Sequence, residues 1–519
     1  MLHRSMASSL RVKILATGCL FFSTMPAAGG PQAALPTKEA VAKSSPAERS
    51  APPPNYVLPA AEILLALGAA SAWYWIDDRN VLDWDNPSIE QRLTGEAWRF
   101  DNNTFGLNYV AHPLAGAGFY VLARGNRVGV WPSFGYSVVG STIWEYVIEF
   151  KEKVSINDMI ITPGAGLPIG EFFHKLAWYL SSVPARSGGQ SALAWTLGLS
   201  VHGHRELAGL SPPPARELDA LGYSAAMWHQ FAFQYGFGVI DPTTGGGPEG
   251  THALSFGGEL VSLPGYRRAG QDGGRWFYEA EVARLDAELD AASRGVGVEV
   301  FAETLAAGYH YQRISPLRRA ALAATVGASV AYQFRRSKTF GYDDRQGLLL
   351  APGLAGDFSA KHGRLSSRLR LGAYPSFGAL SALSYPEWRS QMPGVRTKTV
   401  VQREGYFYSW GWTGRVSAAL GFAPVEFQAD LQYGRHRSID GLDRAQEHVS
   451  HDAPLSDVLA EAGISLWLSP PELPVELGLT WDRRRRASRM GGGSGGAQTP
   501  LAEAFVEGQR LLLKTVLRL

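Results

Sequence analysis

From about Ser191 onward, apolar and polar residues alternate in segments separated by turns rich in Gly, Pro, Asp and Arg. In the segment 322–334, Val326 and Tyr332 share an apolar face, while Thr325 lies on the opposite, polar one. Successive side chains of a strand point to opposite sides, so this alternation predicts β-strands with one apolar face each. Two architectures satisfy the pattern: a soluble sandwich with the apolar face inside, or a membrane barrel with that face toward lipid.

Segment length favours the barrel. Many segments extend for about ten residues or more, close to the roughly 9–11 that a tilted strand needs to cross a bilayer, whereas sandwich strands average about 5–6. Aromatic residues gather near segment ends, as in interfacial girdles, and the segment 406–418 places Tyr406, Tyr408 and Trp410 on its apolar face. We therefore predict a mainly β chain: a C-terminal transmembrane antiparallel β-barrel over 190–519, of about 12 strands because single-chain barrels close with an even number.

Two patterns in this part predict local features. Apolar residues change parity between Trp276 and Ala291, which predicts a bulge near Ala283 and Arg284. The pair His202 and His204 is expected on one face of a strand, without a metal-binding role.

The run Arg483–Arg486 precedes a Gly-rich stretch and is expected in a basic loop. Such a loop could meet lipopolysaccharide phosphates, although a solvated loop is the default interpretation. The chain ends at Leu519 within an alternating segment, whereas barrel proteins commonly end in an aromatic residue.

The N-terminus has the pattern of a secretory signal. A basic region with Arg4 and Arg11 precedes an apolar one, and small residues follow, so residues 1–29 are predicted to be a cleaved signal peptide. Residues 30–56 are rich in Pro, Ala and Ser and are predicted to be a disordered tether. The single cysteine, Cys19, excludes an internal disulfide framework and a CxxC zinc site.

Residues 57–185 are predicted to form an all-helical module before the barrel. Its first segment, 58–75, is apolar enough to suggest a membrane span, but it contains Glu62, so we expect a helix packed on protein or lying at a membrane interface. Leu167 to Leu180 is expected to be a separate helix, because Thr162-Pro163 should end the preceding turn.

The module carries polar residues on helical faces that are otherwise apolar. Asn108 and His112 lie four residues apart, and so do Ser141, Glu145 and Glu149, so each set shares a face. Such groups are costly to bury without partners.

Further along the same module, Arg124 could pair with a carboxylate of the helix that carries Ser141, Glu145 and Glu149. Ser155 and Asp158 resemble a capping box, and Glu171 lies on the following helix.

Two interpretations of these residues remain open. They are satisfied core groups that fix helix register, or His112, Glu145, Glu149 and Asp158 form a catalytic cluster or supply ligands to a divalent metal. Neither HExxH nor a GxSxG elbow is present, so we predict no dedicated metal site and no cofactor. The candidate binding residues are Asn108, Arg124, Ser141 and Glu171.

The motifs Asn103-Thr-Phe, His112-Pro113, Ser141-x-x-Trp144-Glu145 and Ser155-x-Asn157-Asp158 together resemble the bacterial domain-of-unknown-function family numbered 3943. The resemblance covers about Asp101 to Lys175. It implies an association with the bacterial envelope, and it carries over no catalytic residues, because the family has no assigned activity.

These observations predict a protein of the cell outer membrane. The helical module is expected at the periplasmic mouth of the barrel or in its lumen, where polar residues would find partners. The leading hypothesis is a non-enzymatic structural, pore or lipid-handling role, and the alternative is an enzyme acting on lipid or envelope substrate through the His/Glu/Asp cluster. Expected partners are outer-membrane lipid and lipopolysaccharide; nucleic acid is excluded, because 49 basic and 47 acidic residues nearly balance.

Overall fold

The computed structural model describes residues 53–77, 85–183, 187–209, 217–242, 247–439, 453–470, 475–491 and 500–519. The predicted signal peptide at 1–29 and most of the predicted tether at 30–56 lie outside the described residues.

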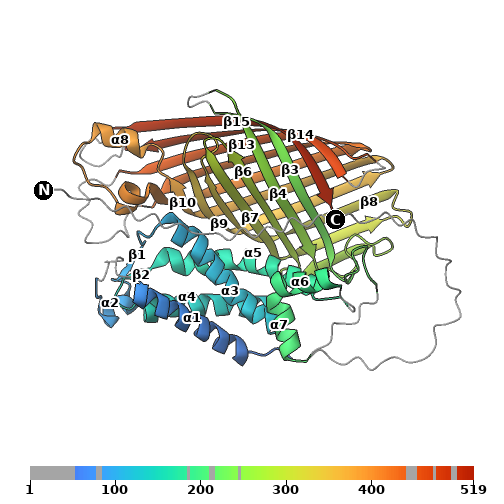
Figure 1. Cartoon of the computed structure of the whole chain (residues 1–519), viewed down its shortest axis with the longest axis horizontal. Helices are drawn as coiled ribbons and strands as arrows, with labels where there is room; N and C mark the ends of the chain where they lie inside the picture. Colours follow the sequence, from blue (N-terminus) through green and yellow to red (C-terminus); the bar gives the residue numbers. More distant parts are fainter. Residues whose placement is uncertain are drawn as a thin grey trace. The chain divides into compact units, whose positions relative to one another are not determined.

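The C-terminal part is a closed antiparallel barrel of twelve strands, as predicted (Figure 1). Each strand pairs with its neighbours in sequence, and pairing of the last strand with the first closes the ring. The polar and apolar residues alternate along each strand, so one face of the wall is apolar. The strands are β3 (Trp228–Pro242), β4 (Glu249–Val261), β6 (Val282–Ala292), β7 (Gly295–Ile314), β8 (Ala320–Ser337), β9 (Asp344–His362), β10 (Leu365–Ser381), β11 (Tyr406–Phe422), β12 (Val425–Ser438), β13 (Leu455–Leu468), β14 (Val475–Met490) and β15 (Ala502–Arg518).

The parity change predicted near Ala283 and Arg284 has a structural basis a few residues earlier. A short strand, β5 (Gly273–Phe277), pairs with the same neighbour, β7, as β6 does, so both occupy one position in the wall. Residues 278–281 interrupt that position, and Ala280 has a positive φ of 53°. The parity signal was therefore genuine, but it marks a broken strand and not a bulge within β6.

The strands begin later than predicted. Residues at 188–207 form two helices, α6 (Gly188–Thr196) and α7 (Leu199–Leu207), so the prediction of strand from Ser191 is wrong there, and His202 and His204 are helical. A capping box starts α6, in which Ser187 Oγ accepts a hydrogen bond from Gln190 N at 3.3 Å. This local signal outweighs the weak alternation of the segment.

The helical module is built on a long helix, α5 (Ile156–Leu180), which runs through Pro163 and Pro168 without a break. The predicted helix end at Pro163 is therefore wrong. Most of α5 is buried, which offsets the cost of the two prolines, about 3 kcal/mol each. Around it lie α1 (Val57–Asp77), α2 (Ile89–Thr94), α3 (His112–Gly125), α4 (Val130–Ile143), the π-helical turns η1 (Leu107–Ala111) and η2 (Trp144–Ile148), and the short parallel pair β1 (Trp98–Arg99) and β2 (Val154–Ser155).

Close approach of α3 and α5 depends on glycine. A Cβ at Gly116 of α3 would lie 1.8 Å from Thr162 O of α5, and one at Gly166 would lie 2.5 Å from Gly116 C. The two helices therefore pack backbone to backbone, as small residues permit.

The module packs against the outer face of the barrel wall. On β8, Arg335 points into the lumen, where it donates to Glu461 of β13 across the barrel at 2.9 Å. Tyr332 lies three residues before Arg335 on the same strand, and an odd spacing places two side chains on opposite faces, so Tyr332 faces outward. Its hydroxyl donates to Tyr109 O of the module at 2.6 Å. The predicted position at the mouth or in the lumen is therefore wrong.

Other contacts repeat this geometry along α5. Phe172 covers the outward face of Gly258 on β4, and Gly164 lies against Leu349 of β9. Figure 1 shows the helices together along one side of the barrel. The physical reason is that the lumen is filled by its own charged side chains, whereas the outer wall offers apolar surface to apolar helices.

The two ends of the barrel differ in their connections. At the end where β3 begins and β15 ends, β9 and β10 are joined by residues 363–364 and β11 and β12 by residues 423–424. At the opposite end, residues 382–405 between β10 and β11 contain α8 (Tyr385–Gln391) and η3 (Val400–Glu404). We refer to these as the short-turn end and the long-loop end.

Candidate functional site

The principal polar cluster of the module is organised around Asp101, which is buried between the module and β11. Its carboxylate accepts hydrogen bonds from Asn108 Nδ2 at 2.6 Å, from Tyr408 OH at 2.8 Å and from Ser155 Oγ at 3.2 Å. Tyr406 OH also donates to Asn103 O at 2.8 Å. The cluster therefore joins two parts of the module to an outward-facing strand position of the barrel.

His112 and Asp158 are brought together at the edge of this cluster, as their candidacy required. His112 Nε2 lies 3.5 Å from Asp158 Oδ2, and the His112 side chain is 14% exposed. Burial lowers the pKa of His112, which the charge of Asp101 only partly offsets. The imidazole is therefore neutral near pH 7.

Asp101 and Asp158 are neighbouring buried carboxyl groups whose pKa values shift in opposite directions. Burial alone would raise the pKa of Asp101, but hydrogen bonds from Asp158, Asn108 and Tyr408 lower it below its ordinary value. Burial and the neighbouring Asp101 charge raise the pKa of Asp158 well above its ordinary value. Of the two carboxyl groups, Asp158 is therefore the one that is more readily protonated and Asp101 the one that is more readily ionised.

Ser155, Glu145 and Ser141 fix the start of α5. Ser155 Oγ accepts a hydrogen bond from Asp158 N at 3.3 Å, which confirms the predicted cap. In a capping box the side chain of Asp158 would accept from Ser155 N, but here Ser155 N donates to Glu145 Oε2 at 2.8 Å. Ser141 Oγ donates to Asp158 O at 3.2 Å, which ties α4 to α5. Burial and the nearby Glu149 raise the pKa of Glu145 well above its ordinary value. Ser141 thus bridges α4 and α5.

Glu149 does not join the cluster. The predicted stripe of Ser141, Glu145 and Glu149 assumed regular α-helical spacing, but the π-helical turn η2 widens the helix between Glu145 and Glu149. Glu149 Oε1 instead accepts from Trp144 Nε1 at 2.8 Å. Burial and the charge of Glu152 raise the pKa of Glu149 to about 8.

This shift predicts a pH-dependent stability. A carboxyl group with an ordinary pKa of 4.5 and a folded-state value of about 8 stabilises the fold at low pH, and the contribution is lost as pH rises through about 8. We expect the free energy of unfolding to fall more steeply between pH 5 and pH 8 in the wild type than in Glu149→Gln, as measured by guanidinium titration in detergent. Parallel pH profiles for the two proteins would contradict the assignment.

A second polar group lies elsewhere on α3 and α5, centred on Glu171. Arg124 Nε donates to Glu171 Oε2 at 3.0 Å, Lys175 Nζ lies 3.0 Å from Oε1, and Tyr120 OH donates at 2.7 Å. Arg124 therefore pairs with a carboxylate, but on α5 and not on α4 as predicted. Burial alone would raise the pKa of Glu171, but the positive charges of Arg124 and Lys175 outweigh this effect and lower the pKa to about 2.

The chemistry available to the principal cluster is limited by access. The lumen cavities and the groove on the outer wall are lined by residues outside the module. Within that same part, no three His, Cys, Asp or Glu side chains converge in a geometry that could hold a metal ion. His112 faces Asp158 and not Glu145 or Glu149, and Asn108 Oδ1 and Glu145 Oε1 are buried without a hydrogen-bond partner among the described residues.

Sequence reasoning missed the residues that anchor this cluster to the barrel. Tyr406 and Tyr408 were recognised only as apolar-face residues of a strand, and Asp101 only as the edge of the family resemblance. A signal was present: both tyrosines carry a hydroxyl on a face predicted to meet lipid, where a buried O–H needs a partner.

The lumen is the other concentration of charge, and ion pairs cross it. Arg284 of β6 lies 3.1 Å from Glu259, 3.2 Å from Glu303 and 2.9 Å from Asp357, which come from three different strands. Arg370 of β10 also pairs with two of these three carboxylates, Glu259 and Asp357. Cations and anions from different strands thus meet inside the lumen, at a level near the short-turn end of the barrel.

Two further groups continue this pattern toward the long-loop end. Arg335 and Arg484 both pair with Glu461 and Glu299. Nearer the long loops, Arg486 of β14 pairs with Asp344 of β9 at 2.7 Å and with Asp457 at 2.7 Å. The charged run predicted as a loop is therefore strand, with Arg484 and Arg486 inward.

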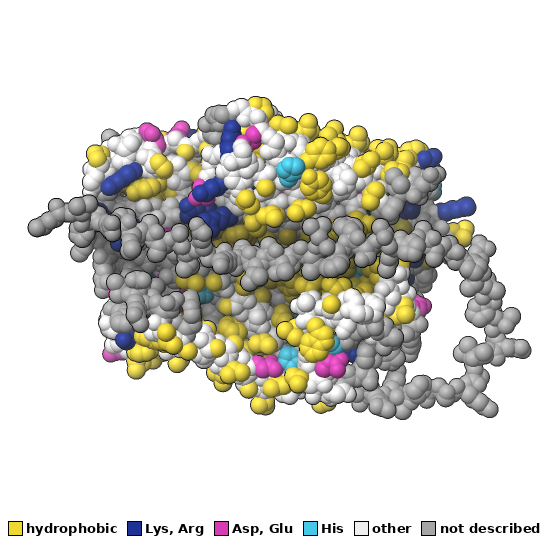
Figure 2. All heavy atoms as spheres, in the orientation of Figure 1, with side chains coloured by type: hydrophobic (Ala, Val, Ile, Leu, Met, Phe, Trp, Pro, Cys, Tyr) yellow, Lys and Arg dark blue, Asp and Glu magenta, His cyan; other side chains and the backbone are white. Residues whose placement is uncertain are grey.

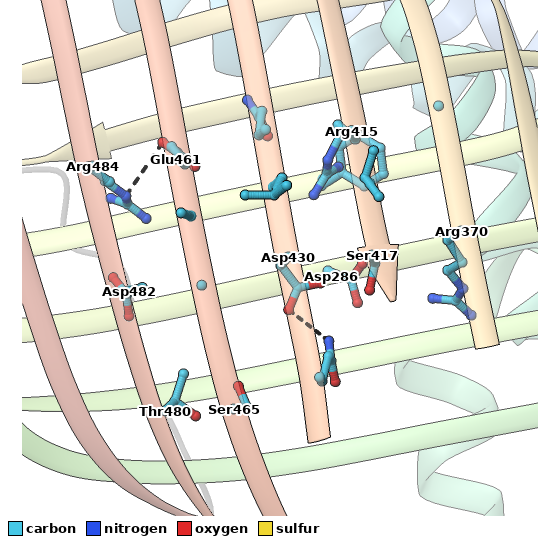
Figure 3. Close-up of a pocket in the computed structure, with 18 of the residues that line it drawn as sticks. Asp286, Arg370, Arg415, Ser417, Asp430, Glu461, Ser465, Thr480, Asp482 and Arg484 are labelled. Atoms are coloured by element: carbon cyan, nitrogen blue, oxygen red, sulfur yellow. Dashed lines mark hydrogen bonds and ion pairs between the residues drawn. The ribbon is translucent and has the colours of Figure 1, made fainter. Parts of the chain in front are cut away.

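What space remains in the lumen is divided into cavities. The largest of those described has a volume of about 430 Å³, and Figure 3 shows its lining, with Glu461 and Arg484 bonded at one side and Asp286, Arg370 and Arg415 around the other. Two neighbouring lumen cavities are about 310 Å³ and 230 Å³. All three cavities are lined by Asp286, so they are adjoining spaces among the ion pairs.

Comparisons with known proteins bear on two parts of the chain. Residues 97–200 match the family model described as Domain of unknown function (DUF3943), which confirms the family resemblance over that segment. No curated protein matches the chain.

Among solved structures, the chain is similar to a FadL homologue from Pseudomonas aeruginosa, at 9% identity over 59% of this chain and 92% of that one, with a TM-score of 0.23. It is also similar to an outer membrane channel from Pseudomonas putida F1, at 11% identity over 56% and 95% with a TM-score of 0.25. A third is the outer membrane channel DcaP of Acinetobacter baumannii, at 10% identity over 58% and 100% with a TM-score of 0.22. TM-scores this low do not establish a shared function.

Proposed function

We propose that the protein spans the bacterial outer membrane through its twelve strands and has a structural, lipid-handling role at the outer wall of a closed barrel. The membrane assignment is supported by the outward side chains, many of them large, apolar and exposed, such as Phe237, Trp412, Phe427 and Leu513. Figure 2 shows hydrophobic side chains gathered on the face of the barrel. An apolar exterior around a charged interior is the pattern of outer-membrane barrels.

The observation that carries the role is the closure of the lumen. Arg284, Arg335 and Arg486 each bridge carboxylates from other strands, at successive levels between the two ends of the barrel. A solute would have to break buried ion pairs to pass, which is costly because it leaves charges without partners. This favours a plugged barrel over an open pore.

The helical module supports a role on the lipid side of the wall. It does not cross the membrane in this proposal, but lies against the wall and is held there by the cluster around Asp101, Tyr406 and Tyr408. Its other face is apolar, with Leu114, Val139 and other large side chains exposed. By length and composition alone α1 could span a membrane; Glu62 within it is bonded to Asn126 and His204.

The alternative of a lipid-modifying enzyme would use His112 and Asp158. Such a reaction needs a substrate beside the imidazole, whereas the lumen cavities and the groove on the outer wall lie elsewhere. The cluster is better explained as the attachment of the module, because each of its main members bonds a residue on another element.

Planar-bilayer recording on the purified full-length protein tests this proposal. We expect the protein to fractionate with outer membranes, to show a heat-dependent gel mobility, and to produce no conductance steps when reconstituted. Steady ion-conducting steps from the wild-type protein would overturn the closed-barrel role, and recovery in the soluble fraction without detergent would overturn the membrane assignment.

A further inference from the structure

A groove crosses the outer wall of the barrel from β8 to β14, with a volume of about 860 Å³. It follows one row of paired residues, in which Val326, Leu371, Val416 and Leu431 lead to Arg483. Seven strands about 4.8 Å apart give this row a length of about 29 Å. The groove is therefore long, narrow and perpendicular to the strands.

The lining of the groove faces outward and is apolar. Val416 and Leu431 are exposed, while Arg415, next to Val416 in sequence, points into the lumen, where it lines the cavity of about 430 Å³. Small residues, including Gly414 and Ala460, line the groove where larger side chains would fill it. The shape suits a flexible apolar chain lying on the wall.

Arginines lie at the β14 end of the groove and beside it on the side of the long loops. Arg483 and Arg485 of β14 line it directly, and Arg435 and Arg437 lie outward on β12, separated from them by β13 alone. Arg483 Nε donates to Glu507 at 2.7 Å. The other three are exposed, and none of them makes an ion pair with a residue in the described part of the chain.

The arginine end lies toward the long loops. Arg437 pairs in register with Trp410 and Arg435 with Trp412, and both tryptophans are exposed on the outer wall. Exposed tryptophans of this kind mark the membrane–water boundary in barrels. The groove thus begins at charged residues near that boundary and descends along the wall to Val326, in the short-turn half of β8.

We propose that the groove and Arg435, Arg437 and Arg485 form a binding site for a lipid with a phosphorylated headgroup, the class to which lipopolysaccharide belongs. An acyl chain would occupy the groove, and phosphate oxygens would accept hydrogen bonds from the arginines. The occupant is identified by charge complementarity: Arg435, Arg437 and Arg485, which make no ion pair within the described part of the chain, lie beside a long apolar groove, and Arg485 stacks on Phe505. The inference rests on the proposed function, because it requires the strands to lie in the outer membrane.

Native mass spectrometry of the full-length protein in neutral detergent provides the test, with diphosphorylated lipid A and zwitterionic phosphatidylethanolamine as probes. We expect the wild type to favour lipid A, and the triple variant Arg435→Gln, Arg437→Gln, Arg485→Gln to bind it at least about tenfold more weakly, since each phosphate contact is charge-assisted. The matched control is Arg313→Gln, Arg319→Gln, Arg336→Gln, which removes three exposed arginines from other places. Equal lipid A binding by the two triple variants would overturn the site.

A second variant tests the groove separately from the charges. Ala460→Trp with Ala462→Trp fills the groove and keeps every arginine, so lipid A binding should again weaken about tenfold while binding of inorganic phosphate is unchanged. Undiminished lipid A binding by this variant would mean that the arginines bind phosphate alone, and the lipid proposal would fail. The same variants are checked for fractionation with outer membranes. Correct fractionation without a lipid preference would contradict this inference alone, whereas recovery outside the outer-membrane fraction would contradict the proposed function.

Discussion

Replacing Glu171 with alanine is expected to lower the free energy of unfolding by about 3–5 kcal/mol, the usual cost of breaking a buried ion pair from one side. Glu171 is fully buried, and its carboxylate bonds Arg124, Lys175 and Tyr120 at once. Removing it leaves two cations without an anion between α3, α5 and the barrel wall. Guanidinium titration in detergent, followed by tryptophan fluorescence, measures the change.

Two further variants make this result interpretable. Glu90→Ala removes an exposed carboxylate of α2 and should change the stability by less than about 0.5 kcal/mol. Adding Arg124→Met and Lys175→Met to Glu171→Ala removes the unpaired cations and should recover much of the loss, because apolar replacement of a buried ionic group is often neutral. If the single and triple variants are equally unstable, the effect arises from lost volume and not from charge.

The barrel was predictable because its signal is local. A strand with one face in lipid repeats every two residues, so segments such as 322–334 and 406–418 reveal strand, face and approximate length without knowledge of their partners. The even count of strands followed from closure. The prediction failed at 188–207, where short alternation competed with a capping box at Ser187, and at Pro163, where tertiary burial of α5 outweighed a local helix-breaking signal.

The position of the module was not predictable from the same information. Polar residues on apolar helices such as α3 and α5 were taken to require a polar lumen, but the lumen is occupied by its own arginines and carboxylates. The module instead obtains its polar partners from itself and from Tyr406 and Tyr408. Which of two surfaces a helix covers depends on what already fills each, and this is a property of the folded barrel.

The candidate site shows the same division. His112 and Asp158, two members of the predicted cluster of four, lie together, and Ser155 caps α5. Glu149 was misplaced because one π-helical turn altered the spacing after Glu145. Arg124 found a carboxylate on a helix further along the chain than expected, since sequence spacing does not determine which helices become neighbours.

Removing the cations that close the lumen is expected to convert the silent barrel into a conducting one. In the triple variant Arg284→Ser, Arg335→Ser, Arg486→Ser, each substitution deletes the central cation of one group of lumen ion pairs, at the two ends and the middle of the barrel. Carboxylates such as Asp457, whose ion-pair partner within the described part of the chain is Arg486, then line the lumen in excess. Water should enter, and current in planar bilayers should rise about tenfold or more over the wild-type background and favour cations over anions, as carboxylate-lined pores do.

The control for this experiment is a triple serine variant at Arg313, Arg319 and Arg336, which are exposed and lie outside the lumen groups. It should remain silent, and both variants must retain the heat-dependent gel mobility of a folded barrel. A folded lumen variant that stays silent would show that something other than these ion pairs closes the barrel. Anion-selective current would contradict the assignment of the carboxylates to the lumen, because the sign of the selectivity reports which charges the ions pass.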